Sequence, residues 1–310
     1  MLVKLKKSND TNINKSSNEN TSSNECNLEI SKNSTLDSEE TSLSLEEKEK
    51  ENNLSFEESF QKYYVDSSQN YNGNFDNYIK KGLKLISLFP IEENYMKEIE
   101  KISQSIHLKD NKNSNKKTLI LDLDETLIHS DLDFIFKNHI TTLYFDSEEE
   151  GNLEKNIPIP LILRPNLFEF LDNVYEKYEL IIFTASNKNY ADKIIDYIEK
   201  DKKYFSLRLY REHCIFIKPG IYIKDLRIFN NRNLKNVILI DNSIFSFANQ
   251  LNNGILITSF YNDNCDSFLL SLIDYLEYFI EKCDDVRLIN KKQFKFEIYK
   301  NDLIKENCIL

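Results

Sequence analysis

The chain of 310 residues has few features of a secreted, zinc-binding or disulfide-rich protein. Its cysteines are odd in number, scattered, and free of any C-x-x-C pair. This usage indicates neither a disulfide framework nor a zinc site, and an intracellular, reducing compartment fits it best. The cysteines are Cys26, Cys214, Cys265, Cys283 and Cys308.

Targeting and membrane signals are also missing. No apolar segment follows the charged start of the chain, so we expect no signal peptide. No window approaches the length of a membrane span. Cys308 lies third from the end, whereas a prenylation box needs a cysteine in the fourth-last position. We therefore expect no membrane anchor.

The chain has no surplus of basic residues. Its net charge of -11 argues against a general nucleic-acid-binding surface, because phosphate backbones are bound by clustered Lys and Arg. A hydrophobic content of 40% is enough for a core but is spread unevenly. Residues 1–70 are dominated by Asn, Ser, Glu and Lys and are predicted to be disordered. A solvated extension is favoured there over a partner-binding or phospho-regulated tail.

Three further parts follow this tail. Apolar residues become more frequent over residues 71–114, where Pro90 interrupts them, and one or two short helices are expected to brace the domain. Residues 115–290 alternate between strand and helix patterns, which predicts an α/β fold with a parallel sheet and helices on both faces. Residues 291–310 form a C-terminal extension.

The expected elements follow from apolar runs and turn residues. Two β-like segments, 139–145 and 158–163, flank an acidic tip at 146–151 and are interpreted as an inserted β-hairpin. Arg164 and Pro165 are expected to open a helix that ends near Tyr178, since Pro is tolerated in a first turn. The other expected elements are strands at 119–121, 179–184, 207–211, 221–223, 237–240 and 255–258 and helices at 188–199 and 267–282.

Two carboxylates lie at the end of the first expected strand. Residues two apart in an extended chain face the same way, so Asp122 and Asp124 would point into one crevice at the carboxyl end of the sheet. Thr126 follows at the same interval. Such close carboxylates repel each other unless a cation or a shared proton relieves them, which suggests a metal site or an acid/base pair. The alternative is an ordinary acidic turn.

Polar residues also end three later strands. Thr184, Lys224 and the pair Asp241–Asn242 follow apolar segments, and the ends of parallel strands converge. Simple helix capping is the alternative for Thr184, and a surface position is the alternative for Lys224. Together the residues suit phosphoryl transfer with Mg²⁺, a hard ion that binds carboxylates, phosphate oxygens and water.

Six motifs, in this order, resemble the small C-terminal-domain phosphatases. This group, with an NLI-interacting-factor-like domain, belongs to the haloacid dehalogenase superfamily and dephosphorylates the serine-rich tail of RNA polymerase II and related phosphoproteins. The resemblance covers roughly residues 115–290 and implies a haloacid dehalogenase-like, Rossmannoid parallel sheet. The motifs are DLDETLIHS (122–130), LRP (163–165), FTAS (183–186), LYREHC (209–214), YIKDL (222–226) and LIDNS (239–243).

The resemblance implies a role for each matched residue. Asp122 would be the nucleophile that forms an aspartyl-phosphate, and Asp124 would be the general acid and base. Mg²⁺ would be bound by Asp122, the backbone carbonyl of Asp124 and Asn242, with Asp241 at or just outside that shell. The substrate-binding residues would be Thr126, Thr184, Ala185, Lys224 and Arg211, for which a structural ion pair is the alternative.

The departures from the family concern the substrate. Ile244 replaces the usual proline after the DNS segment, and Asn166 replaces the usual glycine after Arg-Pro. In the family the inserted hairpin forms part of the peptide groove. Its acidic tip here, Glu148 to Glu150, would repel a multiply phosphorylated tail.

We therefore expect a magnesium-dependent protein serine/threonine phosphatase that acts on phosphoserine of the RNA polymerase II C-terminal domain. It would be a nuclear or nucleocytoplasmic monomer with a phosphoprotein substrate and no direct contact with nucleic acid. The alternatives are a same-fold phosphatase for another nuclear or lipid-metabolism phosphoprotein and a non-catalytic scaffold that binds phosphopeptides. A receiver domain is disfavoured because the D-x-D-x-T order lies on one strand.

Overall fold

Five strands form a parallel sheet in the computed structural model, which describes residues 75–87, 89, 94–109, 116–130, 141–145 and 157–308. Strand β1 is central, and its Ile120 pairs with Ile181 of β5 and Leu239 of β9. The sheet order is β10 (Gly254–Leu256), β9 (Val237–Asp241), β1 (Lys117–Leu121), β5 (Tyr178–Phe183) and β6 (Phe205–Leu209). Strands of continuous Ile and Leu are buried on both faces, as a parallel sheet requires. The predicted α/β class is confirmed.

Alternate residues of each strand pack into two different cores, one on each face of the sheet. Leu119 and Leu121 of β1 pack with the apolar residues of helices α5, α6 and α7. Ile120 packs with those of α3 and α4, which come from the predicted bracing segment. Helices thus cover both faces, as predicted. Their bounds are α3 (Phe75–Ile86), α4 (Tyr95–Ser105), α5 (Leu167–Tyr175), α6 (Lys188–Ile198) and α7 (Phe268–Tyr275).

The inserted hairpin is also confirmed. Strand β3 (Thr141–Phe145) pairs antiparallel with β4 (Ile157–Leu163), and β2 (Ile128–His129) lies on the other side of β4. The acidic tip at 146–151 and the predicted disordered tail at 1–70 lie outside the described residues.

The path of the chain into Lys224 differs from the prediction. Strand β8 (Ile221–Ile223) does not join the parallel sheet but pairs antiparallel with β7 (Ile215–Lys218), which the sequence analysis missed. Lys224 therefore reaches the sheet from a separate two-stranded ribbon. Between β6 and β10, the described chain also contains four short 3₁₀ turns: η2 (Arg211–His213), η3 (Leu226–Ile228), η4 (Leu234–Asn236) and η5 (Leu251–Asn253).

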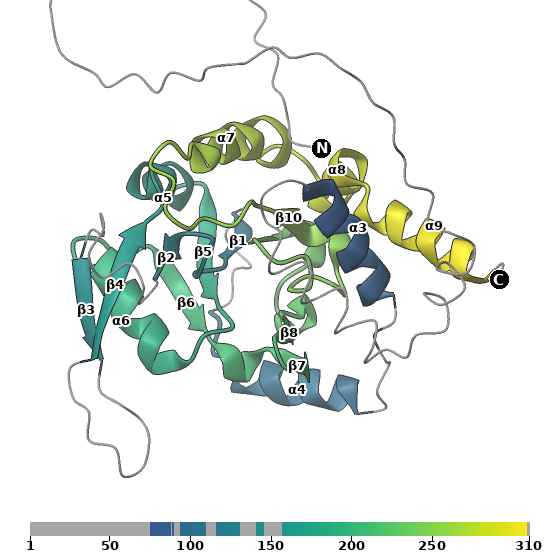
Figure 1. Ribbon diagram of the computed structural model, residues 1–310, viewed down its shortest axis with the longest axis horizontal. Coiled ribbons are helices and arrows are strands. Elements are labelled where there is room, and N and C mark those ends of the chain that lie inside the picture. Colours follow the sequence, from purple (N-terminus) through teal and green to yellow (C-terminus); the bar gives the residue numbers. More distant parts are fainter. Residues whose placement is uncertain are drawn as a thin grey trace, which may run out of the picture. The chain divides into compact units, whose positions relative to one another are not determined.

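The C-terminal part is helical. The helix expected at 267–282 is divided into α7 and a π-helical turn over Leu276–Ile280. Helices α8 (Val286–Phe294) and α9 (Phe296–Cys308) follow, and Figure 1 shows α9, in yellow, beside α3 from the other end of the described chain. No helix in the described part of the chain is both long and apolar enough to cross a bilayer.

A left-handed residue sets the start of α5. The helix begins at Leu167, after a turn through Pro165 and not at the Arg-Pro pair itself. Asn166, its N-cap, has φ 64° and ψ 18°, and its side chain makes no capping hydrogen bond. Asn and Gly tolerate this left-handed region much better than other residues do.

Substitutions at position 166 test this requirement. Asn166→Ala is expected to lower the free energy of unfolding by about 1 kcal/mol, because a Cβ without a polar side chain is strained at positive φ. Asn166→Gly is expected to leave it unchanged or raise it slightly. Urea unfolding followed by circular dichroism measures both, and equal stability of the two variants would contradict the argument.

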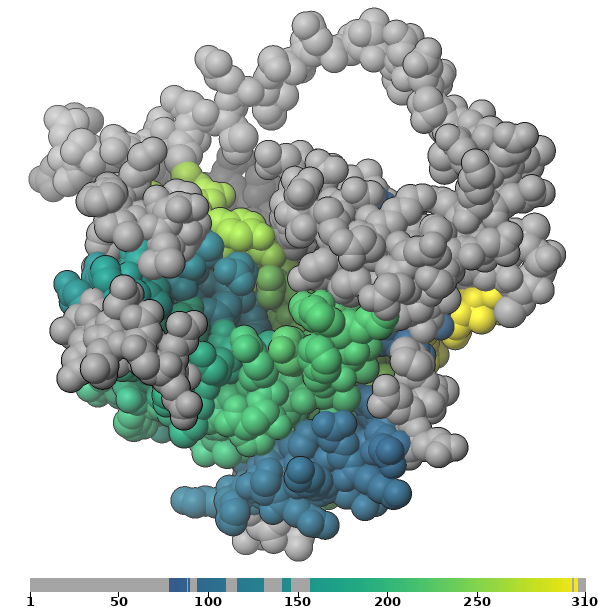
Figure 2. All heavy atoms as spheres, turned by 60° about the horizontal axis from the view of Figure 1, so that its bottom comes forward, coloured from purple at the N-terminus to yellow at the C-terminus, as the bar shows by residue number. Residues whose placement is uncertain are grey.

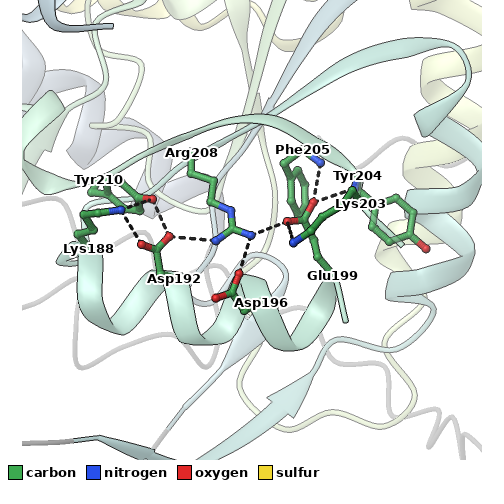
Figure 3. A network of polar contacts seen from close by, with 9 residues as sticks. All are labelled: Lys188, Asp192, Asp196, Glu199, Lys203, Tyr204, Phe205, Arg208 and Tyr210. Carbon is green, nitrogen blue, oxygen red and sulfur yellow. Dashed lines mark hydrogen bonds and ion pairs between the residues drawn. The ribbon is translucent and has the colours of Figure 1, made fainter. Parts of the chain in front are cut away.

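An ion network around the buried Glu199 fixes helix α6 to the edge strand β6. Arg208 of β6 points between three carboxylates on one side of α6, as Figure 3 shows, and its guanidinium lies 2.5 Å from Glu199 Oε2. The Glu199 side chain is 2% exposed and also accepts the N–H groups of Tyr204 and Phe205. Burial opposes the charge of Glu199, but these N–H groups and Arg208 hold the pKa of Glu199 below its usual value.

The network predicts a pH-dependent contribution to stability. Glu199→Gln is expected to cost about 1–2 kcal/mol at pH 7, since it removes a charge-assisted bond. The folded pKa of Glu199 is depressed, so its contribution is present above the usual pKa of 4.5 and is lost as the pH falls further. The free energies of unfolding of the wild type and of the Glu199→Gln variant should therefore converge below about pH 4.

The matched control is Asp196→Asn, which removes another partner of Arg208 whose side chain is 63% exposed. Exposed ion pairs contribute little, so a change within about 0.5 kcal/mol is expected. A larger loss in Asp196→Asn than in Glu199→Gln would mean that burial does not decide the strength of these pairs.

Candidate active site

Lys224 and two aspartates form a buried ion cluster at the carboxyl end of the sheet. The Lys224 Nζ atom lies 2.5 Å from Asp122 Oδ1 and 2.7 Å from Asp241 Oδ2. Asp122 follows β1 and Asp241 ends β9, the neighbouring strand. Burial lowers the pKa of Lys224, but the charges of Asp122 and Asp241 outweigh it and raise this pKa above its usual value. The cluster keeps the ammonium charged.

A tight turn after β1 orients the first carboxylate. The N–H groups of Thr126, Leu127 and Ile128 all donate to the carbonyl of Leu123, and Glu125 takes a positive φ of 54°. The Thr126 hydroxyl donates to Asp122 Oδ2 at 2.7 Å. Thr126 was predicted to bind substrate, but its side chain is fully buried and does not line the pocket. In the structure it supports Asp122.

Asp124 has different surroundings from Asp122. Its Oδ1 accepts the Tyr190 hydroxyl at 2.6 Å, and its Oδ2 accepts those of Ser186 at 2.7 Å and Thr184 at 3.3 Å. Burial raises the pKa of Asp124 to about 6, against the Tyr190 hydrogen bond, which lowers it. The charge of Asp122 raises this pKa further. The carboxylate of Asp122 thus lies beside an ammonium group, whereas that of Asp124 is surrounded by hydroxyl groups.

Tyr190 was missed by the sequence analysis. It lies in the first turn of α6, and Asn187 is the residue that caps this helix, by accepting the N–H of Tyr190. Capping therefore does not explain Thr184 or Ser186, whose hydroxyls face Asp124. The Tyr190 ring stacks on Phe145 of the inserted hairpin with 5.7 Å between centroids. No local motif marks this tyrosine, because its position depends on the hairpin folding over α6.

The oxygen atoms beside Asp122 fit a hard divalent cation. The Thr126 hydroxyl lies between Asp122 Oδ2 and Asn242 Oδ1, 3.3 Å away, so oxygens from two motifs face one point. The Asn242 amide donates to Ser259 Oγ, which leaves its oxygen turned to this point. Burial and, after it, the charge of Asp122 raise the pKa of Asp241 to about 6, against the charge of Lys224, which lowers it. Among the described residues, no group of three or more His, Cys, Asp or Glu side chains is arranged to hold a metal ion, here or elsewhere, so a cation at this point would also depend on Asn242 and backbone oxygens.

A pocket of about 430 Å³ opens over these groups. Every predicted site residue except Thr126 lines it: Asp122, Asp124, Thr184, Ala185, Arg211, Lys224, Asp241 and Asn242. Arg211 Nε donates to the carbonyl of Ala185, and its guanidinium lies over the Tyr222 ring at 5.3 Å. No carboxylate in the described part of the chain forms a salt bridge with Arg211, so the structural ion pair considered from the sequence is not seen there.

Comparison with known proteins identifies the family. A model described as NLI interacting factor-like phosphatase matches residues 117–287, more than half of the chain. The chain belongs to this family. The family is one of phosphatases of the haloacid dehalogenase superfamily, as the six motifs predicted, and this class implies a divalent metal.

Three curated relatives illustrate the similarity. The chain is 39% identical over 183 residues to CTD small phosphatase-like protein 2 of Dictyostelium discoideum, covering 59% of this chain and 30% of that protein. It is 41% identical over 172 residues to nuclear envelope morphology protein 1 of Schizosaccharomyces pombe, covering 56% and 35%. It is 32% identical over 198 residues to CTD nuclear envelope phosphatase 1B of Danio rerio, covering 62% and 73%. The chain thus spans about a third of the length of the first two relatives.

The substitution Tyr190→Phe tests whether the Tyr190 hydroxyl, which donates a hydrogen bond to Asp124, orients that carboxylate. The ring and its stacking on Phe145 are kept, but Asp124 loses its closest donor. We expect kcat for an aryl phosphate to fall about tenfold with KM little changed, because misorientation of a reacting group mainly affects turnover. Tyr197→Phe on the same helix is the control. Equal kcat in both variants would show that Tyr190 does not act through Asp124.

Proposed function

We propose that the chain is a magnesium-dependent protein serine/threonine phosphatase that acts through an aspartyl-phosphate on Asp122. One observation carries the proposal: Asp122 and Asp124 share a pocket but have opposite surroundings. Asp122 lies 2.5 Å from the ammonium of Lys224, where its carboxylate can act as the nucleophile. Asp124 has its pKa raised to about 6, which suits a group that gives and takes a proton near neutral pH.

The first half-reaction transfers the phosphoryl group to the enzyme. A carboxylate oxygen of Asp122 attacks phosphorus, and the bond between phosphorus and the serine oxygen breaks as Asp124 gives that oxygen its proton. The Lys224 ammonium and the Thr184 hydroxyl hold the phosphoryl oxygens. Ala185 and Arg211 bind the substrate at the edge of the pocket. Lys224 is already held by two aspartates, so it needs little reorganisation for this task.

The second half-reaction restores the enzyme. Asp124, now ionised, takes a proton from water, and the resulting hydroxide oxygen attacks phosphorus. The bond between Asp122 and phosphorus breaks, and inorganic phosphate leaves. The hydroxyls of Tyr190 and Ser186 hold Asp124 in place while its charge changes.

Magnesium fits the donor set. The groups that would hold it are Asp122, Asn242, Asp241 and the backbone carbonyl of Asp124. When bound there, the ion would offset the negative charge that the aspartates and the phosphate bring together.

We propose two candidates for the physiological substrate. A phosphoserine of the RNA polymerase II C-terminal domain is the first candidate, and the C-terminal-domain phosphatase-like relatives support it. A phosphoprotein at the nuclear envelope, including a regulator of lipid metabolism, is the second, and the relatives named for the nuclear envelope support it. Both candidates agree with a nuclear or nuclear-envelope location.

Phosphate release tests the mechanism. The wild type is expected to hydrolyse both an aryl phosphate and a phosphoserine peptide with the polymerase-tail sequence when Mg²⁺ is present. A chelator should abolish turnover, and added Mg²⁺ should restore it. Asp122→Asn should reduce kcat at least about 10³-fold in a protein whose circular dichroism spectrum still shows it folded, because the amide cannot act as the nucleophile. Asp124→Asn should also lose turnover, since it cannot donate the proton.

The outcomes separate the alternatives. Retained activity in Asp122→Asn would contradict the covalent mechanism. Turnover of the aryl phosphate but not of the polymerase peptide would favour the second substrate. Tight binding of the peptide by the wild type without release of phosphate would favour the phosphopeptide-binding scaffold.

A further inference from the structure

One wall of the pocket comes from outside the region that matches the family. Helix α3 precedes the matched residues 117–287, yet its Tyr78 lines the same pocket as Asp122 and Lys224. Tyr78 thus borders the same space as the residues proposed to handle the phosphate, and a part of the substrate beyond the phosphoryl group can reach it.

Helix α3 is held closely against the loop that follows the metal-site motif. The N–H of Ile244 donates to the Tyr78 hydroxyl at 3.4 Å. One helical turn later, a Cβ on Gly82 would lie 2.6 Å from Ile244 Cγ2, so only glycine permits this approach without a shift. Tyr78 and Gly82 are four residues apart and share one face of the helix. Tyr78 is thus fixed to the loop that carries Asn242.

Phe245 extends this wall. It lines the pocket with Tyr78, and its Cζ would lie 3.9 Å from a Cβ on Gly82. The two rings therefore belong to one surface made by α3 and the loop after Asn242. The charged groups of the pocket are the clustered aspartates, Glu125, Lys224 and Arg211, which come from other segments. An aromatic wall of this kind favours an apolar side chain.

Helix α4 supports the same region from the other flank. The Tyr95 hydroxyl donates to Asp225 Oδ2 at 3.0 Å, and Asp225 is the neighbour of Lys224 in the chain. Figure 2 shows α4, in blue, directly against a green surface, and α4 packs on η3, the turn that follows Lys224 and Asp225. Both helices of the segment before the family match thus contact loops that carry site residues.

We propose that Tyr78 and Phe245 form an aromatic wall that contacts an apolar residue next to the phosphorylated residue of the substrate. Helix α3 then sets the peptide preference of the pocket together with Phe245 of the matched region, which also supplies the chemistry. The inference rests on the proposed function, because it concerns the substrate of the same site.

Phosphoserine peptides that differ at one flanking position test the wall. In two matched pairs, the residue before or after the phosphoserine is either Leu or Asp, and kcat/KM is measured for each peptide with Mg²⁺. The wild type should prefer Leu over Asp in at least one pair. Tyr78→Ala should reduce that preference about fivefold or more, whereas Tyr78→Phe should keep it because the ring remains. Lys80→Ala, an exposed change on the same helix, should match the wild type.

A charge on the wall gives a result that loss of folding cannot imitate. Tyr78→Lys should raise kcat/KM for the Asp peptide relative to the Leu peptide and so move the preference toward acidic flanks. Unchanged preferences in both Tyr78→Ala and Tyr78→Lys would overturn the inference. So would a wild type that hydrolyses all the peptides equally, although the proposed function would then stand. A wild type that hydrolyses no peptide and no aryl phosphate would overturn the proposed function and this inference with it.

Discussion

The ammonium of Lys224 holds the candidate site together. Removing three ionised side chains from water costs several kcal/mol for each, and close opposite charges recover that cost only in good geometry. Lys224 meets Asp122 and Asp241 at 2.5 and 2.7 Å, from three different segments. The rigid parallel sheet fixes the two aspartates on neighbouring strands, and the ribbon of β7 and β8 brings the lysine between them. The parallel sheet and the ribbon together therefore keep the three side chains in place.

The cluster also explains how two carboxylates so close in sequence differ. The turn after β1 directs Asp122 toward the lysine and Asp124 toward the hydroxyls of Tyr190, Ser186 and Thr184. The hydroxyl side is completed by α6 and by the hairpin that packs on Tyr190. The surroundings of Asp122 and of Asp124 thus depend on different parts of the fold, although both residues come from one strand end.

Much of this was predictable from sequence. Continuous apolar runs predicted β1, β5 and β9, and the polar residues after these runs predicted the strand ends. Both patterns can be recognised within a few neighbouring residues of the sequence. Three features were not predictable in this way. Strand β7 is short, and the antiparallel partner of β8 is chosen by tertiary pairing. Tyr190 acquires its contact only when the hairpin folds over α6. The buried position of Thr126 results from the turn at Glu125, whose positive φ no residue pattern announces.

The packing of α3 beside α9 and against the loop after Asn242 has a consequence for how such enzymes diverge. A helix that precedes the catalytic region shapes the pocket without carrying any reacting group. On the proposal that α3 contacts the substrate, substitutions in it would change which peptides are accepted and would leave the aspartates and the lysine in place. Descendants of one ancestral phosphatase can then acquire new targets by exchanging a single flanking helix, and the chemistry is inherited intact.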